Sequence, residues 1–434
     1  MRRFLCLFII IISIFSVFAT SNFINEPIAS VDNELAYPFA RVELLLDAYP
    51  AFTKEEFHEK NRLSHPTLLE LTGGNAEPSS GYFFLHYSPN WDKADPDKNP
   101  VLLIHGAGDT AFRAWAHPFK FYVKPGEEIQ YKGLALTLAD KGYSVFSITF
   151  VHPHGDNFMQ SEQIANAISR IKKVLHREGD PTFQVDIIAH SKGGVAARMY
   201  LSDIREEYSE YSWLTPYRKD VRRFMSLSTP LKGVDTAYRY YGMNLYIVQD
   251  DTAAPMGADK LLYYGMWRDF QEHNDMFPGQ YQLLHDFVND NETSIPLSNL
   301  SATPFDMNYS RNVLYNGGVS GTLVSSGIKS GIKKGKDLIN KLNQKGMDPS
   351  VELVVVAGND NLIKDDIEYF VDLFPMGEDI APSDSLLFVE SATYTKGILR
   401  RGAKLIDKVV IPYNHMNITF HHTAKDILIH LLEE

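Results

Sequence analysis

Short apolar runs alternate with longer amphipathic segments along most of this chain. The runs are rich in β-branched or aromatic residues and are too short for helices, so each predicts a strand. They occupy residues 81–87, 100–104, 143–150, 185–190, 351–357 and 406–411. Helical spacing of apolar side chains predicts helices at 133–141, 160–176 and 423–432. The alternation of strand and helix favours an α/β fold with a mostly parallel central sheet.

The region before these strands gives weaker patterns. We expect one helix around residues 40–47 and another around 54–62. Residues 1–19 combine two arginines, an uninterrupted apolar stretch and a Val-Phe-Ala end, which together predict a secretory signal peptide cut near Ala19. Cys6, the one cysteine of the chain, lies within this segment, so no disulfide is expected after cleavage. The protein is therefore expected to be exported, to a secreted, periplasmic or cell-surface location.

The strand at 185–190 ends abruptly in Ala-His-Ser-Lys-Gly-Gly, and residues 195–201 then read as a helix. A sharp turn between strand and helix lifts a serine hydroxyl off the end of a buried sheet, where a base and a substrate reach it. Positions two before and two after that serine must be small, and here they are Ala189 and Gly193. Ser191 is therefore the candidate nucleophile, although such turns also occur in α/β proteins without this chemistry.

A second glycine-rich turn follows the strand at 100–104, where the chain reads His105-Gly-Ala-Gly. In acyl transfer the carbonyl oxygen becomes an oxyanion, which two fixed backbone N–H groups stabilise. We assign these two donors to Ala107 and Lys192. Only the backbone of Lys192 is expected to take part, so its side chain is incidental to that role. His105 is expected to brace the loop and not to act as a base.

A serine nucleophile needs a base and an acid, which are expected after it in the order acid, histidine. His415 follows the last strand in a loop where no apolar packing demands a histidine, and it is the candidate base. His421 and His422 compete with it but are expected to belong to the start of the terminal helix. For the acid, Asp360 and Asp384 both lie in the interval, and both stay open at this point.

Taken together, these motifs resemble those of secreted α/β-hydrolases of the bacterial triacylglycerol lipase kind. The matching stretches are PVLLIHGAG, VDIIAHSKGG, FMSLSTPLKG, SDSLLFVESA and PYNH, in that order from residue 100 to residue 415. The A-H-S-K-G turn departs from the strict G-x-S-x-G pattern by one methyl group, as in the elbow of certain bacterial lipases. SDSLLFVESA resembles a lipase segment whose aspartate orients the histidine. The resemblance therefore implies Asp384 as the acid, with Asp360 in reserve.

The resemblance also implies an α/β-hydrolase fold with flanking helices and an inserted cap or lid. On this interpretation residues 20–95 form an N-terminal extension, and the sequence does not indicate its role. The hydrolase core lies in two parts, 96–233 and 350–434, separated by the insertion at 234–349.

The insertion is where substrate preference is expected. Its first half is crowded with aromatic residues, which favour either a cap over the serine or a small satellite core. These are Tyr238, Tyr240, Tyr241, Tyr246, Tyr263, Tyr264, Trp267 and Phe270. Its second half, at 325–344, predicts a basic amphipathic helix that touches lipid, forms a lid or lies on the core.

The formal net charge of −12 argues against nucleic acid as a partner, since phosphates demand a basic surface. Zinc-type cysteine and histidine spacing, a phosphate loop and a dinucleotide fingerprint are missing from the sequence, so no cofactor or catalytic metal is expected. The aspartates scattered along the chain are compatible with binding of a structural calcium ion.

The expected function is that of a secreted serine hydrolase that cleaves carboxylic esters, as a lipase acting on acyl lipids. Its partners would be the lipid or other ester substrate and, transiently, a lipid surface. The same residues would also serve a polyester depolymerase, a thioesterase or an acyltransferase. A catalytically silent relative would instead be a binding protein, but nothing except chemistry requires three triad residues in order.

Overall fold

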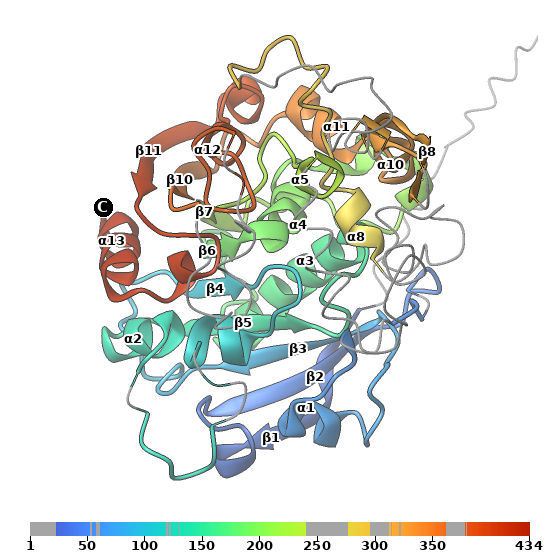
Figure 1. Cartoon of the computed structure of the whole chain (residues 1–434). Helices are drawn as coiled ribbons and strands as arrows, with labels where there is room; N and C mark the ends of the chain where they lie inside the picture. The colour runs from blue at the N-terminus through green and yellow to red at the C-terminus, as the bar shows by residue number, and fades with distance from the viewer. Residues whose placement is uncertain are drawn as a thin grey trace, which may run out of the picture.

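The computed structural model describes residues 23–239, 277–295, 312–361 and 378–434, apart from 53, 58–60, 119, 121–122, 130, 314, 321–322 and 379. The predicted signal peptide at 1–19 and most of the aromatic first half of the insertion, residues 240–276, lie outside the described residues. Figure 1 shows the arrangement of the elements.

The strands are β1 (Phe23–Asp32), β2 (Arg41–Asp47), β3 (Tyr82–Tyr87), β4 (Val101–Ile104), β5 (Val145–Phe150), β6 (Val185–His190), β7 (Val221–Leu227), β8 (Gly318–Ser320), β9 (Leu323–Ser325), β10 (Glu352–Gly358) and β11 (Lys404–Ile411). The α-helices are α1 (Pro66–Leu71), α2 (Leu134–Asp140), α3 (Asn157–Val174), α4 (Ser191–Leu201), α5 (Thr236–Arg239), α8 (Pro278–Tyr281), α10 (Ile328–Lys334), α11 (Leu338–Lys345), α12 (Val389–Ala392) and α13 (His422–Glu433). Shorter helical turns are η1 (Asn33–Leu35), η3 (Phe112–Ala116), η4 (Ile204–Glu207), η5 (Ser209–Tyr211), η6 (Ile398–Arg401) and η7 (Asn417–Thr419).

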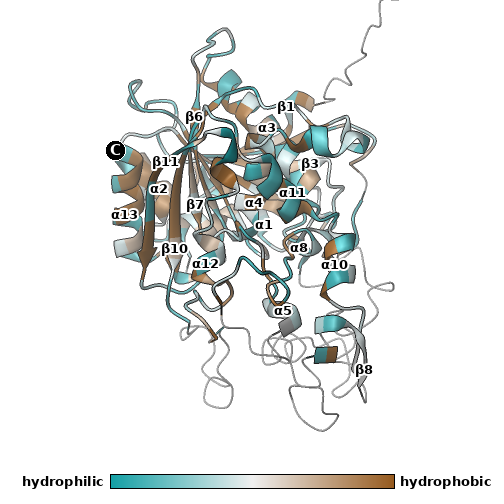
Figure 2. Cartoon of the chain, turned by 90° about the horizontal axis from the view of Figure 1, so that it is seen from above, coloured by the Kyte–Doolittle hydropathy of each residue, from teal (hydrophilic) through white to brown (hydrophobic). Residues whose placement is uncertain are grey.

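The described residues form one nine-stranded sheet in the order β1-β2-β3-β5-β4-β6-β7-β10-β11. Neighbouring strands from β5 to β11 pair in parallel, whereas β1, β2 and β3 are joined to the sheet by antiparallel pairings. Helices α2 and α13 cover one face, and α3, α4 and α11 cover the other (Figure 2). Leu138 and Leu428 belong to the first of the two resulting cores, and Ile168 and Leu201 to the second.

The strands and helices predicted from the apolar pattern after residue 80 are present with small shifts at their ends. Crossovers through helices on both faces are what a parallel sheet requires, because its strands cannot be joined by tight turns. The predicted α/β-hydrolase fold is confirmed.

The helix expected around residues 40–47 is wrong, because this segment is strand β2. Its run of leucines has good helix propensity, but the strand is enclosed between β1 and β3. Leu44 enters one core and Leu45 the other, as the alternation of side chains along a strand demands. The helix expected around 54–62 is also wrong for the described residues, none of which is α-helical. Three strands of the sheet thus come from the region predicted as an N-terminal extension.

The amphipathic helix predicted in the second half of the insertion is two short helices, α10 and α11, which separate at Gly335. Leu338, Ile339 and Leu342 on α11 are buried in a core that also contains Val195 of α4. The apolar face of α11 therefore lies on the protein core, which was one of the three expected arrangements, and is not exposed for contact with lipid.

A buried ion pair ties β2 to α3. Glu43 is 1% exposed, and its carboxylate accepts hydrogen bonds of 2.8 Å from both Nε and Nη2 of Arg170. The hydroxyl of Tyr87 on β3 donates to the same carboxylate at 2.5 Å. Two parallel bonds from a guanidinium make the strongest form of such a pair.

We expect Arg170→Met to lower the free energy of unfolding by about 3–5 kcal/mol, because it removes both guanidinium hydrogen bonds from the buried Glu43 carboxylate. Lys132→Met is the matched control, since Lys132 pairs with Asp140 at an exposed site. That change should cost less than about 1 kcal/mol. Urea titrations followed by circular dichroism measure both values, and equal midpoints for the two variants would contradict the role of the buried pair.

Candidate active site

Ser191 lies where β6 ends and α4 begins, at the carboxyl edge of the parallel strands (Figure 1). Its φ of 52° is in the left-handed region, which a non-glycine residue adopts only under constraint. A Cβ on Gly193 would lie 2.2 Å from the carbonyl oxygen of His105, and one on Gly194 would lie 2.0 Å from Oγ1 of Thr229. The small residues of this turn are therefore required by the packing around it.

The three residues assigned to the triad form a continuous chain of hydrogen bonds. Nε2 of His415 lies 2.9 Å from Oγ of Ser191, and Nδ1 of His415 lies 2.8 Å from Oδ2 of Asp384. Because an ionised carboxylate only accepts hydrogen bonds, Nδ1 carries the proton in this arrangement and Nε2 is left to accept the serine hydroxyl. His415 and Asp384 are 4% and 1% exposed, so water does not compete for these bonds.

Asp384, and not Asp360, receives the imidazole of His415. The second oxygen of Asp384 accepts the backbone N–H groups of Leu386 and Leu387 at 3.2 and 2.8 Å, which hold the carboxylate in one orientation. Asp360 follows β10, and its backbone N–H donates to the carbonyl of Tyr413 at 3.2 Å.

His105 is placed to brace its loop, as expected. Its Nε2 accepts the backbone N–H of Phe150 at 3.2 Å, so Nδ1 carries the proton and donates to the carbonyl of Gly106 at 2.7 Å. The side chain is 1% exposed, and burial lowers the pKa of His105 to about 4. An imidazole with both nitrogens engaged in the backbone cannot serve as a base for Ser191.

The competing histidines lie at the start of the terminal helix. His421 precedes α13, and His422 is its first residue. The ring of His421 lies 4.3 Å from that of Tyr413, in a tilted contact. His190, to which the sequence analysis assigns no role, donates a hydrogen bond from its Nε2 to the backbone carbonyl of His415 at 2.9 Å. This bond helps to hold the candidate base in place.

The loop at 105–108 packs directly on the turn that carries Ser191. A Cβ on Gly106 would lie 3.0 Å from Cβ of Ser191 and 2.9 Å from Nδ1 of His190. Ala107, the next residue, is half-buried. Lys192 is the second residue of α4, and backbone N–H groups in a first helical turn have no partner within the helix. Both residues assigned as oxyanion donors therefore lie next to Ser191.

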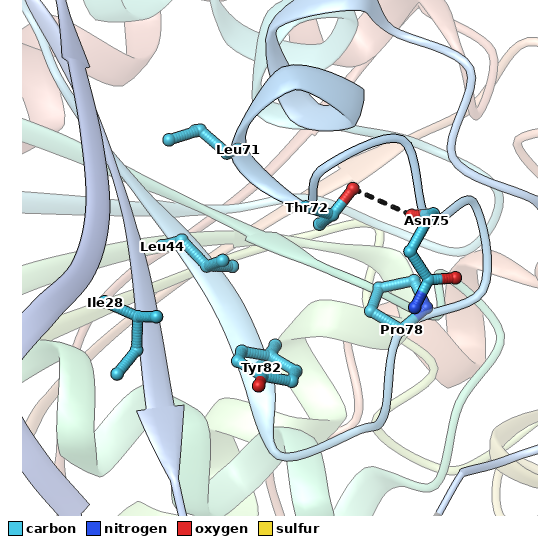
Figure 3. Close-up of a pocket in the computed structure, with 7 residues that line it drawn as sticks. All are labelled: Ile28, Leu44, Leu71, Thr72, Asn75, Pro78 and Tyr82. Carbon is cyan, nitrogen blue, oxygen red and sulfur yellow. Dashed lines mark hydrogen bonds between the residues drawn. The ribbon is translucent and has the colours of Figure 1, made fainter.

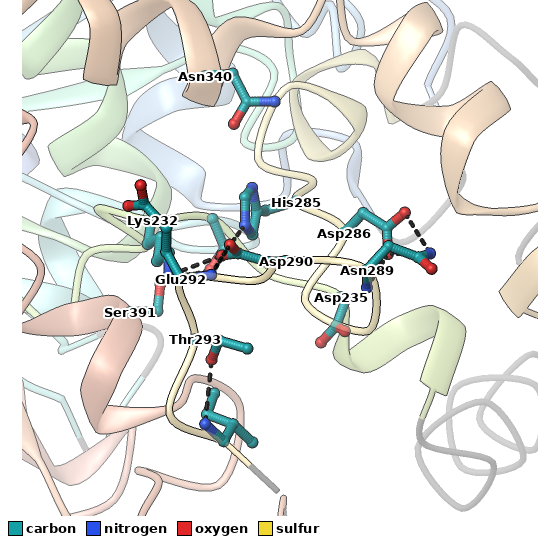
Figure 4. Close-up of polar contacts among 12 residues, drawn as sticks. Lys232, Asp235, His285, Asp286, Asn289, Asp290, Glu292, Thr293, Asn340 and Ser391 are labelled. Atoms are coloured by element: carbon teal, nitrogen blue, oxygen red, sulfur yellow. Dashed lines mark hydrogen bonds and ion pairs between the residues drawn. The ribbon is translucent and has the colours of Figure 1, made fainter. Parts of the chain in front are cut away.

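The part of the insertion at residues 277–295 is anchored beside the segment that carries Asp384. Nζ of Lys232, whose side chain is 6% exposed, lies 2.7 Å from Oδ2 of Asp290 and 3.4 Å from Oε1 of Glu390 on α12. Nε2 of His285 contacts the same oxygen of Asp290 at 2.9 Å (Figure 4). This cluster joins the part of the insertion at 277–295 to the core at Lys232 and to the region just after Asp384.

A cavity of about 250 Å³ lies between α1 and strands β1, β2 and β3, far along the sheet from β6 (Figure 3). The residues that line it are Ile28, Leu44, Leu71, Thr72, Asn75, Pro78 and Tyr82. It contains none of the residues around Ser191, so it is not the reaction site.

In the part of the chain that the structure describes, no group of three or more histidine, cysteine, aspartate or glutamate residues is arranged to hold a metal ion. Across the same described ranges, no helix is both long enough and apolar enough to cross a membrane.

The model of the class 2 lipase family matches residues 98–242. Among solved structures, the chain is similar to a lipase of Bacillus licheniformis, with 16% identity, 78% of this chain and 94% of the other covered, and a TM-score of 0.37. It is also similar to a Staphylococcus hyicus lipase, with 13% identity, 79% and 98% coverage and a TM-score of 0.42. A thermostable carboxyl esterase of Bacillus coagulans gives 12% identity, 82% and 94% coverage and a TM-score of 0.38. The family match makes this chain similar to the class 2 lipases and supports a carboxylic ester hydrolase.

Proposed function

We propose that this protein is a secreted serine hydrolase that cleaves the carboxylic esters of acyl lipids through a triad of Ser191, His415 and Asp384. The observation that carries the proposal is the chain of hydrogen bonds from Asp384 through His415 to Ser191, at 2.8 and 2.9 Å. A buried carboxylate, an imidazole and a serine in a strained turn have no structural need of one another.

In the first half of the reaction, Nε2 of His415 accepts the proton of the Ser191 hydroxyl as Oγ attacks the ester carbonyl. Asp384 stabilises the imidazolium that forms and holds the ring in the required tautomer. The carbonyl oxygen becomes an oxyanion, which accepts hydrogen bonds from the N–H groups of Ala107 and Lys192. His415 then gives its proton to the leaving alcohol, and the acyl group stays on Ser191.

In the second half, His415 takes a proton from water, and the resulting hydroxide attacks the acyl-enzyme. The same two N–H groups stabilise the second oxyanion. Collapse of this intermediate returns the proton to Ser191 and releases the carboxylic acid. No metal or organic cofactor enters either half of this scheme.

The lipid substrate and export rest on two further observations. The class 2 lipase family matches residues 98–242, the part of the chain that holds the candidate nucleophile and both oxyanion donors. Residues 1–19 have the basic start, apolar stretch and small-residue end of a signal peptide.

The proposal predicts that the mature protein hydrolyses p-nitrophenyl esters and that Ser191→Ala lowers kcat by at least about 10⁴-fold, because the attacking oxygen is removed. Esters of graded acyl length distinguish a lipase from an esterase, since an apolar acyl pocket should make kcat/KM rise with chain length. Turnover by Ser191→Ala at the rate of the unchanged protein would refute the proposed nucleophile.

A matched pair of variants tests the acid. Asp384→Asn keeps the shape of the side chain but favours the wrong tautomer of His415, and should lower kcat by about 10⁴-fold. Asp360→Asn should leave kcat within about threefold, since Asp360 does not receive the imidazole. The reverse pattern would make Asp360 the acid.

The close packing of the oxyanion loop on α4 predicts that Gly193→Ala lowers kcat by about 10²-fold or prevents folding. The added Cβ would collide with the carbonyl of His105 at 2.2 Å and push the loop that carries Ala107 away from Ser191. Gly179→Ala is the control, since its added Cβ would meet nothing within 4 Å. Ester assays and thermal unfolding of both variants measure the effect, and a fully active, fully stable Gly193→Ala would contradict it.

A further inference from the structure

The side chain of Lys192 is buried, although sequence reasoning treats it as incidental. It is 1% exposed, and its Nζ donates a hydrogen bond to Oε1 of Gln160 in the first turns of α3. Burial lowers the pKa of Lys192 to about 7. A buried ammonium is costly to keep, so its presence one residue after the nucleophile calls for a reason beyond packing.

Two carboxylates face this ammonium from other parts of the chain. Glu55, from the segment between β2 and α1, and Asp156, at the start of α3, both interact favourably with the charge of Lys192. They are joined to each other, because Oε1 of Glu55 accepts the backbone N–H of Asp156 at 2.8 Å. Asp156 also caps α3 by accepting the N–H of Phe158 at 2.7 Å. Ser80 donates to the other oxygen of Glu55.

Helix α8, which belongs to the insertion, covers Lys192 from another side. A Cβ on Gly279 of α8 would lie 2.3 Å from Cε and 2.8 Å from Nζ of Lys192, so α8 packs directly on the lysine. Asn157 joins α8 and the residue that follows it to α3. Its side-chain amide donates to the carbonyl of Gly279 at 2.9 Å, and its backbone N–H donates to Oε1 of Gln282 at 2.7 Å. Lys192 thus lies where α4, α3, α8 and the segment around Glu55 meet.

We propose that the Lys192 side chain is a positioning residue, whose ammonium joins these segments and holds the first turn of α4 in the geometry that Ser191 and the Lys192 N–H need. This inference rests on the proposed function, because it concerns the geometry of the same nucleophile and oxyanion donor. An apolar side chain of equal length would fill the space but leave the carboxylates of Glu55 and Asp156 without their counter-charge.

The role of the ammonium makes the geometry depend on pH. The titratable groups that face Lys192 are Glu55, Asp156, His105 and His152. Burial lowers the pKa of both His105 and His152 to about 4, so these imidazoles are already neutral around pH 7. As the pH rises through about 7, Lys192 loses its proton and the carboxylates lose their counter-charge. Activity should therefore fall on the alkaline side of neutrality.

The test compares kcat and KM for a soluble p-nitrophenyl ester from pH 5.5 to 9 in the unchanged protein, Lys192→Met and Glu55→Gln, with the rate of Ser191→Ala subtracted. Lys192→Met should lower kcat about ten- to hundredfold with little change in KM, and should lose the alkaline decline. Adding Glu55→Gln to Lys192→Met should restore part of the loss, because it removes an uncompensated charge. Lys329→Met, at an exposed lysine of α10, should behave like the unchanged protein.

Glu55→Gln alone keeps the test decisive if Lys192→Met does not fold. Glu55 favours the charged form of Lys192, so its neutralisation should move the alkaline decline to lower pH. An unchanged pH profile in Glu55→Gln, or an unchanged kcat in a folded Lys192→Met, would overturn the positioning role while leaving Ser191 as nucleophile. Activity that survives in Ser191→Ala would instead overturn the proposed function.

Discussion

The close contact between two backbone turns is the constraint on which the candidate site depends. The carbonyl of His105 lies so near the first turn of α4 that residue 193 must be glycine, and Gly106 in turn lies against Ser191. This contact sets the position of the serine relative to Ala107. Because both turns follow buried parallel strands that are direct neighbours, the sheet itself fixes the distance between them. The candidate nucleophile and the candidate oxyanion donors are therefore placed by main chain, which varies less than side-chain rotamers.

The base and the acid are held to this frame by main-chain bonds as well. The backbone N–H of His415 donates to the carbonyl of Asp384 at 2.7 Å, alongside the bond between their side chains. His190, one residue before the nucleophile, donates to the carbonyl of His415. The backbones of His415 and Asp384 are thus bonded to each other, and that of His415 also to the side chain of His190. A side chain whose backbone is held in this way loses little entropy when the transition state forms.

The sequence predicts the parts of this protein that are local in the chain. Turns after strands, such as those at His105 and Ser191, reveal themselves by glycine and by the apolar run before them. Strand β2 is predicted wrongly because its leucines favour a helix, and only its neighbours in the sheet determine otherwise. The buried environment of Lys192 is missed for the same reason, since Gln160 lies 32 residues away in sequence and Glu55 further still. The one feature of the sequence that could have indicated this environment is the presence of a lysine in an otherwise uncharged turn.

The first three strands give the fold a property that a detachable extension would lack. They cover the side of β5 away from β4, and Glu43 is bonded to Arg170 on the far layer. A chain shortened to begin at the first parallel strand would present the bare edge of β5, whose unpaired N–H and C=O groups are a template for pairing with other chains. The segment before residue 96 therefore pairs an edge of the hydrolase core that would otherwise be exposed.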